Sequence, residues 1–138
     1  MDIIDARVQD HTRLFCACLD LLARTEPFSK FEAGRLIRSV QDQMERNTCL
    51  FIIEGERLTG YLGWLVTSNE VVETWRESNT GLKPDEPAEA IVVTIMAVDR
   101  PKDILALIKK AKSVSHGLPV YWKRYGQKSF ETRVRSVP

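Results

Sequence analysis

The chain has 138 residues, 43% of them hydrophobic, and its 20 basic residues almost balance its 19 acidic ones. This length fits one domain with a real core, so we expect a single domain over residues 1–138, and the composition excludes a disordered chain. A net charge of +1 argues against nucleic acid as the default partner.

The cysteines Cys16, Cys18 and Cys49 are odd in number and lie in apolar surroundings. They are predicted to be core residues in a reducing compartment rather than a disulfide framework. No second Cys or His pair is spaced to complete a zinc site, so no metal is expected. No apolar run approaches the roughly 20 residues that span a bilayer, and the N-terminus lacks the features of a signal peptide. We therefore expect a cytoplasmic protein without a membrane span, or a virion protein if a phage encodes it.

Two helices are predicted in the first third of the chain. From about Ala6 to Arg24 apolar residues recur at helical spacing, and Pro27 ends that pattern. Ser29 and Glu32 then match a capping box, in which a serine hydroxyl and a glutamate side chain satisfy the free amides of a helix start. The second helix is expected to run to about Glu45.

A β-hairpin follows. The apolar runs Leu50–Ile53 and Leu58–Val66 flank a charged turn at residues 54–57. Both faces of the second run are largely apolar, which predicts a central strand. Gly60 and Gly63 inside it indicate a bulge or a close backbone approach.

A helix start is indicated at Thr67–Glu70, with a short helix to about Glu77. Ser78–Glu89 has the composition of a loop, and 12 residues are many for a connection, which favours a binding loop or a mobile flap. Ala90–Val98 is continuously apolar and is predicted to be a strand buried on both faces.

Pro101 suits the first turn of the next helix, and His116 with Gly117 closes it. The apolar stripe of this helix is expected at Ile104, Leu105, Ile108, Ala111 and Val114.

The last two predicted strands, Pro119–Arg124 and Ser129–Val137, form a hairpin in which aromatic and basic residues are interleaved. Such a surface binds single-stranded nucleic acid or phosphorylated partners. The other interpretation is a hairpin whose rings pack and whose charges are solvated. The candidate binding surface consists of Tyr121, Trp122, Lys123, Arg124, Tyr125, Lys128, Arg133 and Arg135.

The predicted order is α-α-β-β-α-β-α-β-β, which is typical of an α+β protein with a central mixed, mostly antiparallel sheet and flanking helices. The strand-helix-strand step from Ala90 to Tyr121 allows one parallel pair.

This order of helices and strands, together with the amino-acid sequence of the first hairpin, resembles the toxin-activating lysine acyltransferases of the hemolysin C type. These are GNAT-like enzymes that move a fatty acyl chain from acyl carrier protein to a toxin lysine. The resemblance covers about Arg24 to Val137, and its best segments are Cys49–Ser68, with Tyr61 and Trp64, and Ile91–Lys112. It implies a GNAT-like sheet.

In that family a histidine after the first helix acts as nucleophile or base, and an aspartate in the strand before the crossover helix supports it. Ser29, or Phe28, stands at the histidine position, and Thr94 stands at the aspartate position. The resemblance makes Ser29 and Thr94 the catalytic positions. A helix cap and a core residue are the alternative interpretations.

Acetyltransferase-like folds hold the pantetheine pyrophosphate on backbone amides of a glycine-rich turn that opens the crossover helix. Here that turn, residues 98–103, has no glycine, and Asp99 and Asp103 repel phosphate. Arg100 and Lys102 are the remaining candidates for cofactor contacts.

Two classes of function follow. The favoured one is a non-catalytic binding or structural protein on a GNAT-like acyltransferase scaffold, without a cofactor, as a virion or mobile-element component. Its partner is expected to be a protein, in a homo-oligomer or a larger assembly. The alternative is a divergent protein-lysine acyltransferase that uses acyl carrier protein or acyl-CoA, with Ser29, His11 or a carboxylate replacing the missing base. Nucleic-acid binding by the basic-aromatic hairpin is a third hypothesis.

Overall fold

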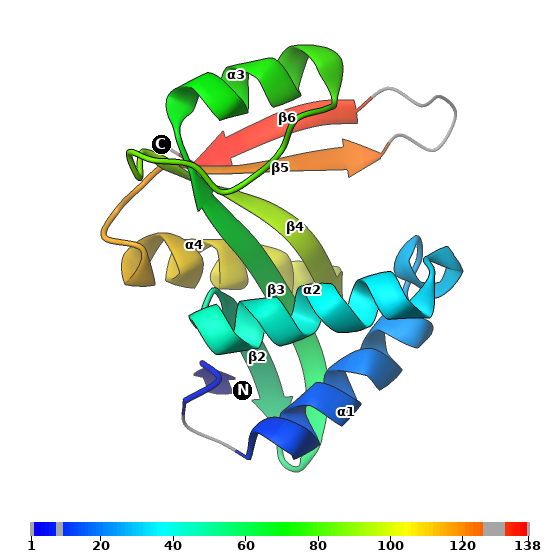
Figure 1. Cartoon of the computed structure of the whole chain (residues 1–138). Coiled ribbons are helices and arrows are strands. Elements are labelled where there is room, and N and C mark those ends of the chain that lie inside the picture. Colours follow the sequence, from blue (N-terminus) through cyan, green and yellow to red (C-terminus); the bar gives the residue numbers. More distant parts are fainter. Residues whose placement is uncertain (1, 8–9, 126–131, 138) are drawn as a thin grey trace. The chain divides into compact units, whose positions relative to one another are not determined.

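The computed structural model describes residues 2–7, 10–125 and 132–137, with side chains as far as Lys123. The described strands form one six-stranded sheet in the order β1-β2-β3-β4-β5-β6. Figure 1 traces the elements along the chain. Their bounds are β1 Asp2–Ile4, α1 His11–Ala23, η1 Phe28–Lys30, α2 Ala33–Arg46, β2 Cys49–Glu54, β3 Arg57–Thr67, α3 Asn69–Ser78, β4 Ala90–Val98, η2 Pro101–Asp103, α4 Ile104–Val114, β5 Val120–Tyr125 and β6 Thr132–Val137.

The chain divides into two compact units. The first consists of Met1–Gly63 and Ile95–Leu107, and the second of Trp64–Thr94 and Ile108–Pro138. Strands β3 and β4 and helix α4 contribute to both units, and each unit is described by itself below.

The start of the first unit differs from the prediction. A short strand, β1, pairs antiparallel with β2, so that Asp2 lies opposite Ile53. Helix α1 begins at His11 rather than near Ala6, because the Asp10 side chain accepts hydrogen bonds from the backbone amides of Thr12 (2.9 Å) and Arg13 (3.4 Å).

The predicted capping box at Ser29 and Glu32 is wrong. Ser29 lies inside the single 3₁₀ turn η1, and its amide donates to the carbonyl of Thr25 (2.9 Å). Helix α2 is preceded by Glu32 at the N-cap, without a side-chain capping bond, and it ends at Asn47 in the left-handed conformation (φ 54°).

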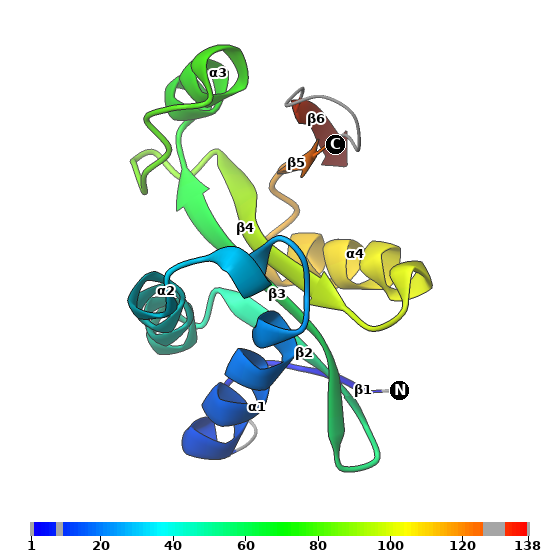
Figure 2. The same cartoon turned by 90° about the vertical axis from the view of Figure 1, so that its right-hand side faces the viewer.

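Helices α1 and α2 pack on the β2–β3 hairpin, and Figure 2 shows both on the same side of it. The predicted bulge is confirmed, because the β2–β3 register shifts between Ile52 and Ile53, beside Gly60. The core of this unit includes Leu14, Cys18, Leu21, Leu22, Val40, Met44, Cys49, Phe51 and Tyr61.

The predicted close approach at Gly63 is also confirmed. The side chain of Gln43, from α2, occupies the space that a Cβ at Gly63 would need. The hydroxyl of Tyr61, which is fully buried, donates a hydrogen bond to Gln43 Oε1. The helix can approach the strand this closely only because residue 63 has no side chain.

Two of the three cysteines are in the core. Cys18 and Cys49 are buried, and burial raises the pKa of both thiols, that of Cys49 to about 12. Cys16 is exposed on α1, so its prediction as a core residue is wrong.

In the second unit, the predicted helix start is confirmed, because the Ser68 hydroxyl caps α3 by accepting from the Val71 amide (3.3 Å). The long loop after α3 is tied back to that start. Ser68 Oγ donates to Asp85 Oδ2 (2.7 Å), which lowers the pKa of this carboxyl, and the Glu89 carboxylate accepts from both nitrogens of Asn69 (3.3 and 3.0 Å).

Strand β4 pairs in parallel with β5, with Ile91 opposite Val120 and Val92 opposite Tyr121, which is the parallel pair that the strand-helix-strand step allows. Helix α4 buries Leu107, Ile108 and Ala111. Two members of its predicted stripe are wrong, since Leu105 is 54% exposed and Val114 is 46% exposed. Leu105 lies about 160° around the helix from Leu107 and so faces away from the core.

Strands β5 and β6 form the predicted antiparallel hairpin, with Trp122 opposite Arg135 and Arg124 opposite Arg133.

Replacing Gly63 by alanine should destabilise the protein. The added methyl group overlaps Gln43 Oε1 and disturbs its buried bond with Tyr61, so Gly63→Ala is expected to lower the free energy of unfolding by about 1–3 kcal/mol in urea denaturation. Gly34→Ala is the matched control, because its Cβ would lie 3.7 Å from the nearest atoms. The control should lose no stability, and an equal loss in the two variants would contradict this account.

Candidate functional site

The two positions aligned with the acyltransferase residues are exposed and belong to different units. Ser29 lies in η1 of the first unit, and no side-chain hydrogen bond of Ser29 is found among the described residues. Thr94 is an exposed residue of β4 in the second unit, so the prediction of a core residue there is wrong. The histidines are exposed as well: His11 begins α1 and His116 follows α4.

Ion pairs gather where β4 leads into α4, all within the first unit. Asp99 Oδ2 lies 3.5 Å from an Arg24 guanidinium nitrogen and 3.6 Å from one of Arg57. The Asp99 amide also donates to the carbonyl of Thr59 (2.8 Å), which fixes the backbone of the junction to β3. Arg24 also forms an ion pair with Asp20, in which a guanidinium nitrogen lies 2.6 Å from Asp20 Oδ2.

Arg100 is engaged in the same region. It forms an ion pair with Glu54 of β2, and its Nε lies 3.1 Å from Asp103 Oδ2. Asp103, in η2, is only 5% exposed. We call Arg24, Glu54, Arg57, Asp99, Arg100 and Asp103 the junction cluster.

The junction cluster contains three arginines and three carboxylates, so the arginines near this turn already face anions of the chain itself. A helix start attracts anions through its free amides, but here Pro101 brings no N–H and Asp99 and Asp103 bring negative charge. Of the two predicted cofactor contacts, Arg100 is paired and Lys102 is exposed.

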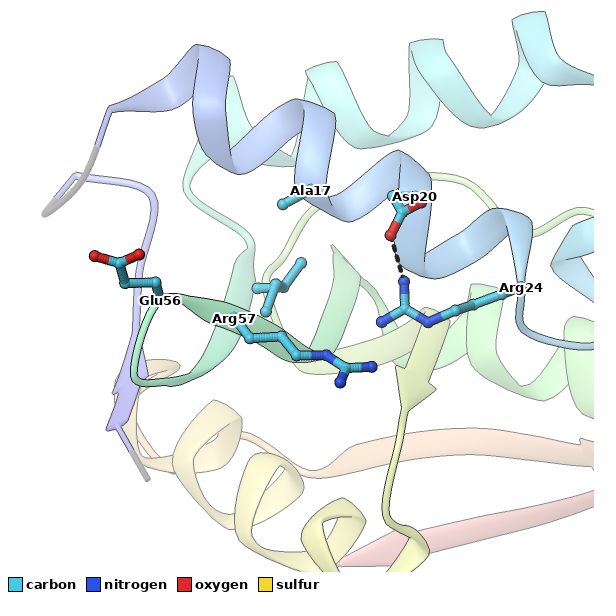
Figure 3. A pocket seen from close by; sticks show the side chains of 6 residues that line it. Ala17, Asp20, Arg24, Glu56 and Arg57 are labelled. Atoms are coloured by element: carbon cyan, nitrogen blue, oxygen red, sulfur yellow. Dashed lines mark hydrogen bonds and ion pairs between the residues drawn. The ribbon is translucent and has the colours of Figure 1, made fainter.

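Two adjoining depressions lie between α1 and the β2–β3 turn, in the first unit. The larger, about 430 Å³, is lined by Ala17, Asp20, Arg24, Glu56, Arg57 and Leu58, and Figure 3 shows it from close by. The smaller, about 220 Å³, shares Ala17, Glu56 and Leu58 with it and adds Asp10, Arg13, Leu14, Ile53 and Gly55. The two depressions share these three lining residues, and we call the pair the α1 groove.

The basic-aromatic surface of the second unit is partly built into the fold. Lys123 Nζ lies 4.2 Å from the centre of the Trp75 ring and donates to the Trp75 carbonyl (2.8 Å) and to Asn79 Oδ1 (2.6 Å). Burial lowers the pKa of Lys123. Tyr121 packs against the cluster that contains Val72 and Trp75. These contacts match the interpretation in which rings pack.

The rest of that predicted surface is described only in part. Trp122 is half-buried, and Arg124, Tyr125, Arg133 and Arg135 are placed as residues of β5 and β6 without their side chains. Lys128 lies outside the described residues.

The described residues hold no group of three His, Cys, Asp or Glu side chains that could bind a metal ion. Nor do they include a helix long and apolar enough to cross a membrane.

Sequence reasoning missed both the junction cluster and the α1 groove. Arg57 and Glu54 stand in a turn that looks merely solvated, and Arg24 and Asp99 are 75 residues apart. The one local signal is the spacing of Asp20 and Arg24, four residues apart on α1.

Comparison with solved structures supports the fold. The chain is similar to the GNAT-like decarboxylase GphF, solved in complex with isobutyryl-CoA, with a TM-score of 0.67 and 18% sequence identity over 92% of this chain and 68% of that one. No family model matches the chain, and no curated protein matches it. The predicted fold class is confirmed: the chain has an α+β, GNAT-like fold.

The contacts of Lys123 predict that its ammonium group stabilises the fold. Lys123→Met keeps an aliphatic side chain over the Trp75 ring but removes two hydrogen bonds and a cation–π contact. It is expected to lower the free energy of unfolding by about 1–2 kcal/mol. Lys110→Met, on the exposed side of α4, is the control and should change it by less than about 0.5 kcal/mol. A silent Lys123→Met would instead favour a solvated lysine that is free to bind a partner.

Proposed function

We propose that this chain is a non-catalytic protein-binding or structural module built on a GNAT-like scaffold. The observation that carries the proposal is the junction cluster. It lies at the turn where acetyltransferase-like folds hold a pyrophosphate. There Asp99 forms ion pairs with Arg24 and Arg57. Arg100 forms ion pairs with Glu54 and Asp103. A pyrophosphate at this turn would have to displace chain carboxylates and lie beside them, which costs electrostatic energy.

The aligned catalytic positions support the same proposal. Serine is a weak nucleophile unless a base activates it, and Ser29 has no side-chain hydrogen bond among the described residues. Thr94 replaces the family's carboxylate with a hydroxyl, which cannot stabilise a positively charged imidazole as a carboxylate does. A protein partner needs neither group.

A second candidate is an enzyme that uses acyl-CoA or acyl carrier protein, such as a divergent lysine acyltransferase. It is favoured by the hemolysin C-type resemblance and by the similarity to GphF, a GNAT-like decarboxylase whose structure contains isobutyryl-CoA. In this hypothesis Lys102, exposed at the start of η2, would contact the cofactor.

Nucleic-acid binding by the basic-aromatic hairpin is the weaker hypothesis, because Lys123 is committed to Trp75 and Asn79. A virion or mobile-element role is a further hypothesis, based on the apparent loss of the acyl site and not on any motif.

Native mass spectrometry and a turnover assay test the proposal. The intact protein, mixed with acyl-CoA and with acyl carrier protein, is expected to form no complex at donor concentrations of about 100 μM. It should also release no free coenzyme A above the buffer rate in a chromatographic assay with a lysine-containing peptide.

Asp99→Asn is the matched variant, because it removes the carboxylate that both Arg24 and Arg57 face. It is expected to bind coenzyme A more tightly than the unaltered chain, although still weakly. Donor binding or turnover by the unaltered chain would reject the non-catalytic function in favour of the second candidate.

A further inference from the structure

The α1 groove has the dimensions of a site for an extended peptide. Its α1 wall runs from Asp10 to Arg24, which is about 21 Å at 1.5 Å per helical residue. An extended chain advances about 3.3 Å per residue, so roughly six residues fit along the wall.

Two small residues line the groove. Ala17, in the middle of α1, lines both depressions. Gly55, at φ 62°, lines the smaller one, and no atom lies within 4 Å of the position that a Cβ at this residue would take. The floor is apolar, since Leu14 and Leu58 are each only 5% exposed and line it. Figure 3 shows the larger depression between Ala17, Asp20 and Arg24 of α1 and Glu56 and Arg57 of the β2–β3 hairpin.

The charges of the groove distinguish between classes of partner. Most are already paired: Asp20 with Arg24, Arg57 with Asp99, and the Asp10 carboxylate with amides of α1. The Arg13 and Glu56 side chains, both exposed in the smaller depression, have no hydrogen bond or ion pair among the described residues. The available charges are therefore one cation and one anion beside an apolar floor.

This pattern favours a mixed-charge peptide over a polyanion. The lining of the groove holds the three carboxylates of Asp10, Asp20 and Glu56 and an equal number of arginines, so it offers no excess of positive charge to the backbone of a nucleic acid. A peptide with one acidic and one basic side chain on either side of an aliphatic pair satisfies Arg13 and Glu56 and covers Ala17 and Leu58.

We propose that the α1 groove binds a partner protein through an extended segment of about six residues that carries an aliphatic centre flanked by an acidic and a basic side chain. This inference rests on the proposed protein-binding function and names its site and the chemistry of its partner.

Nuclear magnetic resonance titration of the intact ¹⁵N-labelled protein tests it. The probes are four blocked six-residue peptides with the same aliphatic centre and with flanks that are acidic and basic, both acidic, both basic, or both neutral. The mixed-charge peptide is expected to shift amides of residues 10–24 and 53–58 saturably, with a dissociation constant on the order of 100 μM. The other three should bind at least about fivefold more weakly.

Two variants sharpen the experiment. Ala17→Trp fills the groove and should weaken the mixed-charge peptide by about tenfold or more, whereas Cys16→Trp, at the adjacent exposed position that does not line the groove, should leave the affinity unchanged. Glu56→Lys, an exposed substitution, should shift the preference to the doubly acidic peptide even if Ala17→Trp fails to fold.

Three results would overturn the proposal: no saturable shift up to about 2 mM of the mixed-charge peptide, equal affinity for all four peptides, or shifts of the same amides with protein concentration alone, which would make a second copy the occupant. Turnover with acyl-CoA is read by a separate signal. Turnover would reject only the non-catalytic function, whereas a lack of binding by all four peptides would reject only the proposed peptide site.

Discussion

The packing of α2 on the β2–β3 hairpin depends on the missing side chain at residue 63. Gln43 reaches over Gly63 and accepts a hydrogen bond from the buried hydroxyl of Tyr61, so one glycine, one amide and one phenol set the distance between helix and strand. An unpaired polar group at this depth would be costly. The same hairpin carries Glu54, Glu56 and Arg57 at its turn, and these residues supply charges to the junction cluster and to the α1 groove.

The proposed function rests on the junction cluster, which lies at the turn where acetyltransferase-like folds hold a pyrophosphate. Each ion pair is partly exposed and contributes little stability by itself. In the proposed function its effect is on recognition, because Arg24 and Arg57 share Asp99, and Arg100 pairs with Glu54 and Asp103. An incoming pyrophosphate therefore meets cations whose charge is already balanced. Among the described residues, the lining of the α1 groove holds one unpaired charge of each sign, which is the basis of the proposed peptide site.

Most of the fold, and little of the site, could be predicted from the sequence. Features that depend on neighbouring residues were predicted correctly. Ser68 caps α3, Gly60 lies beside the bulge, and Ala90–Val98 is a strand. Strand β1 was missed because three residues are too few to show a period. The capping box at Ser29 failed because the same polar residues also suit the single turn of η1. The pairing of Arg24 with Asp99 joins residues 75 apart and has no local signature.

The claim that the junction cluster blocks a nucleotide can be tested at the turn itself. In a titration of the ¹⁵N-labelled protein with coenzyme A, followed by nuclear magnetic resonance, the amides of residues 98–104 should keep their chemical shifts at coenzyme A concentrations of about 1 mM. Saturable shifts of these amides at micromolar coenzyme A would contradict the account, because they would place the pyrophosphate against the carboxylates that are argued to exclude it.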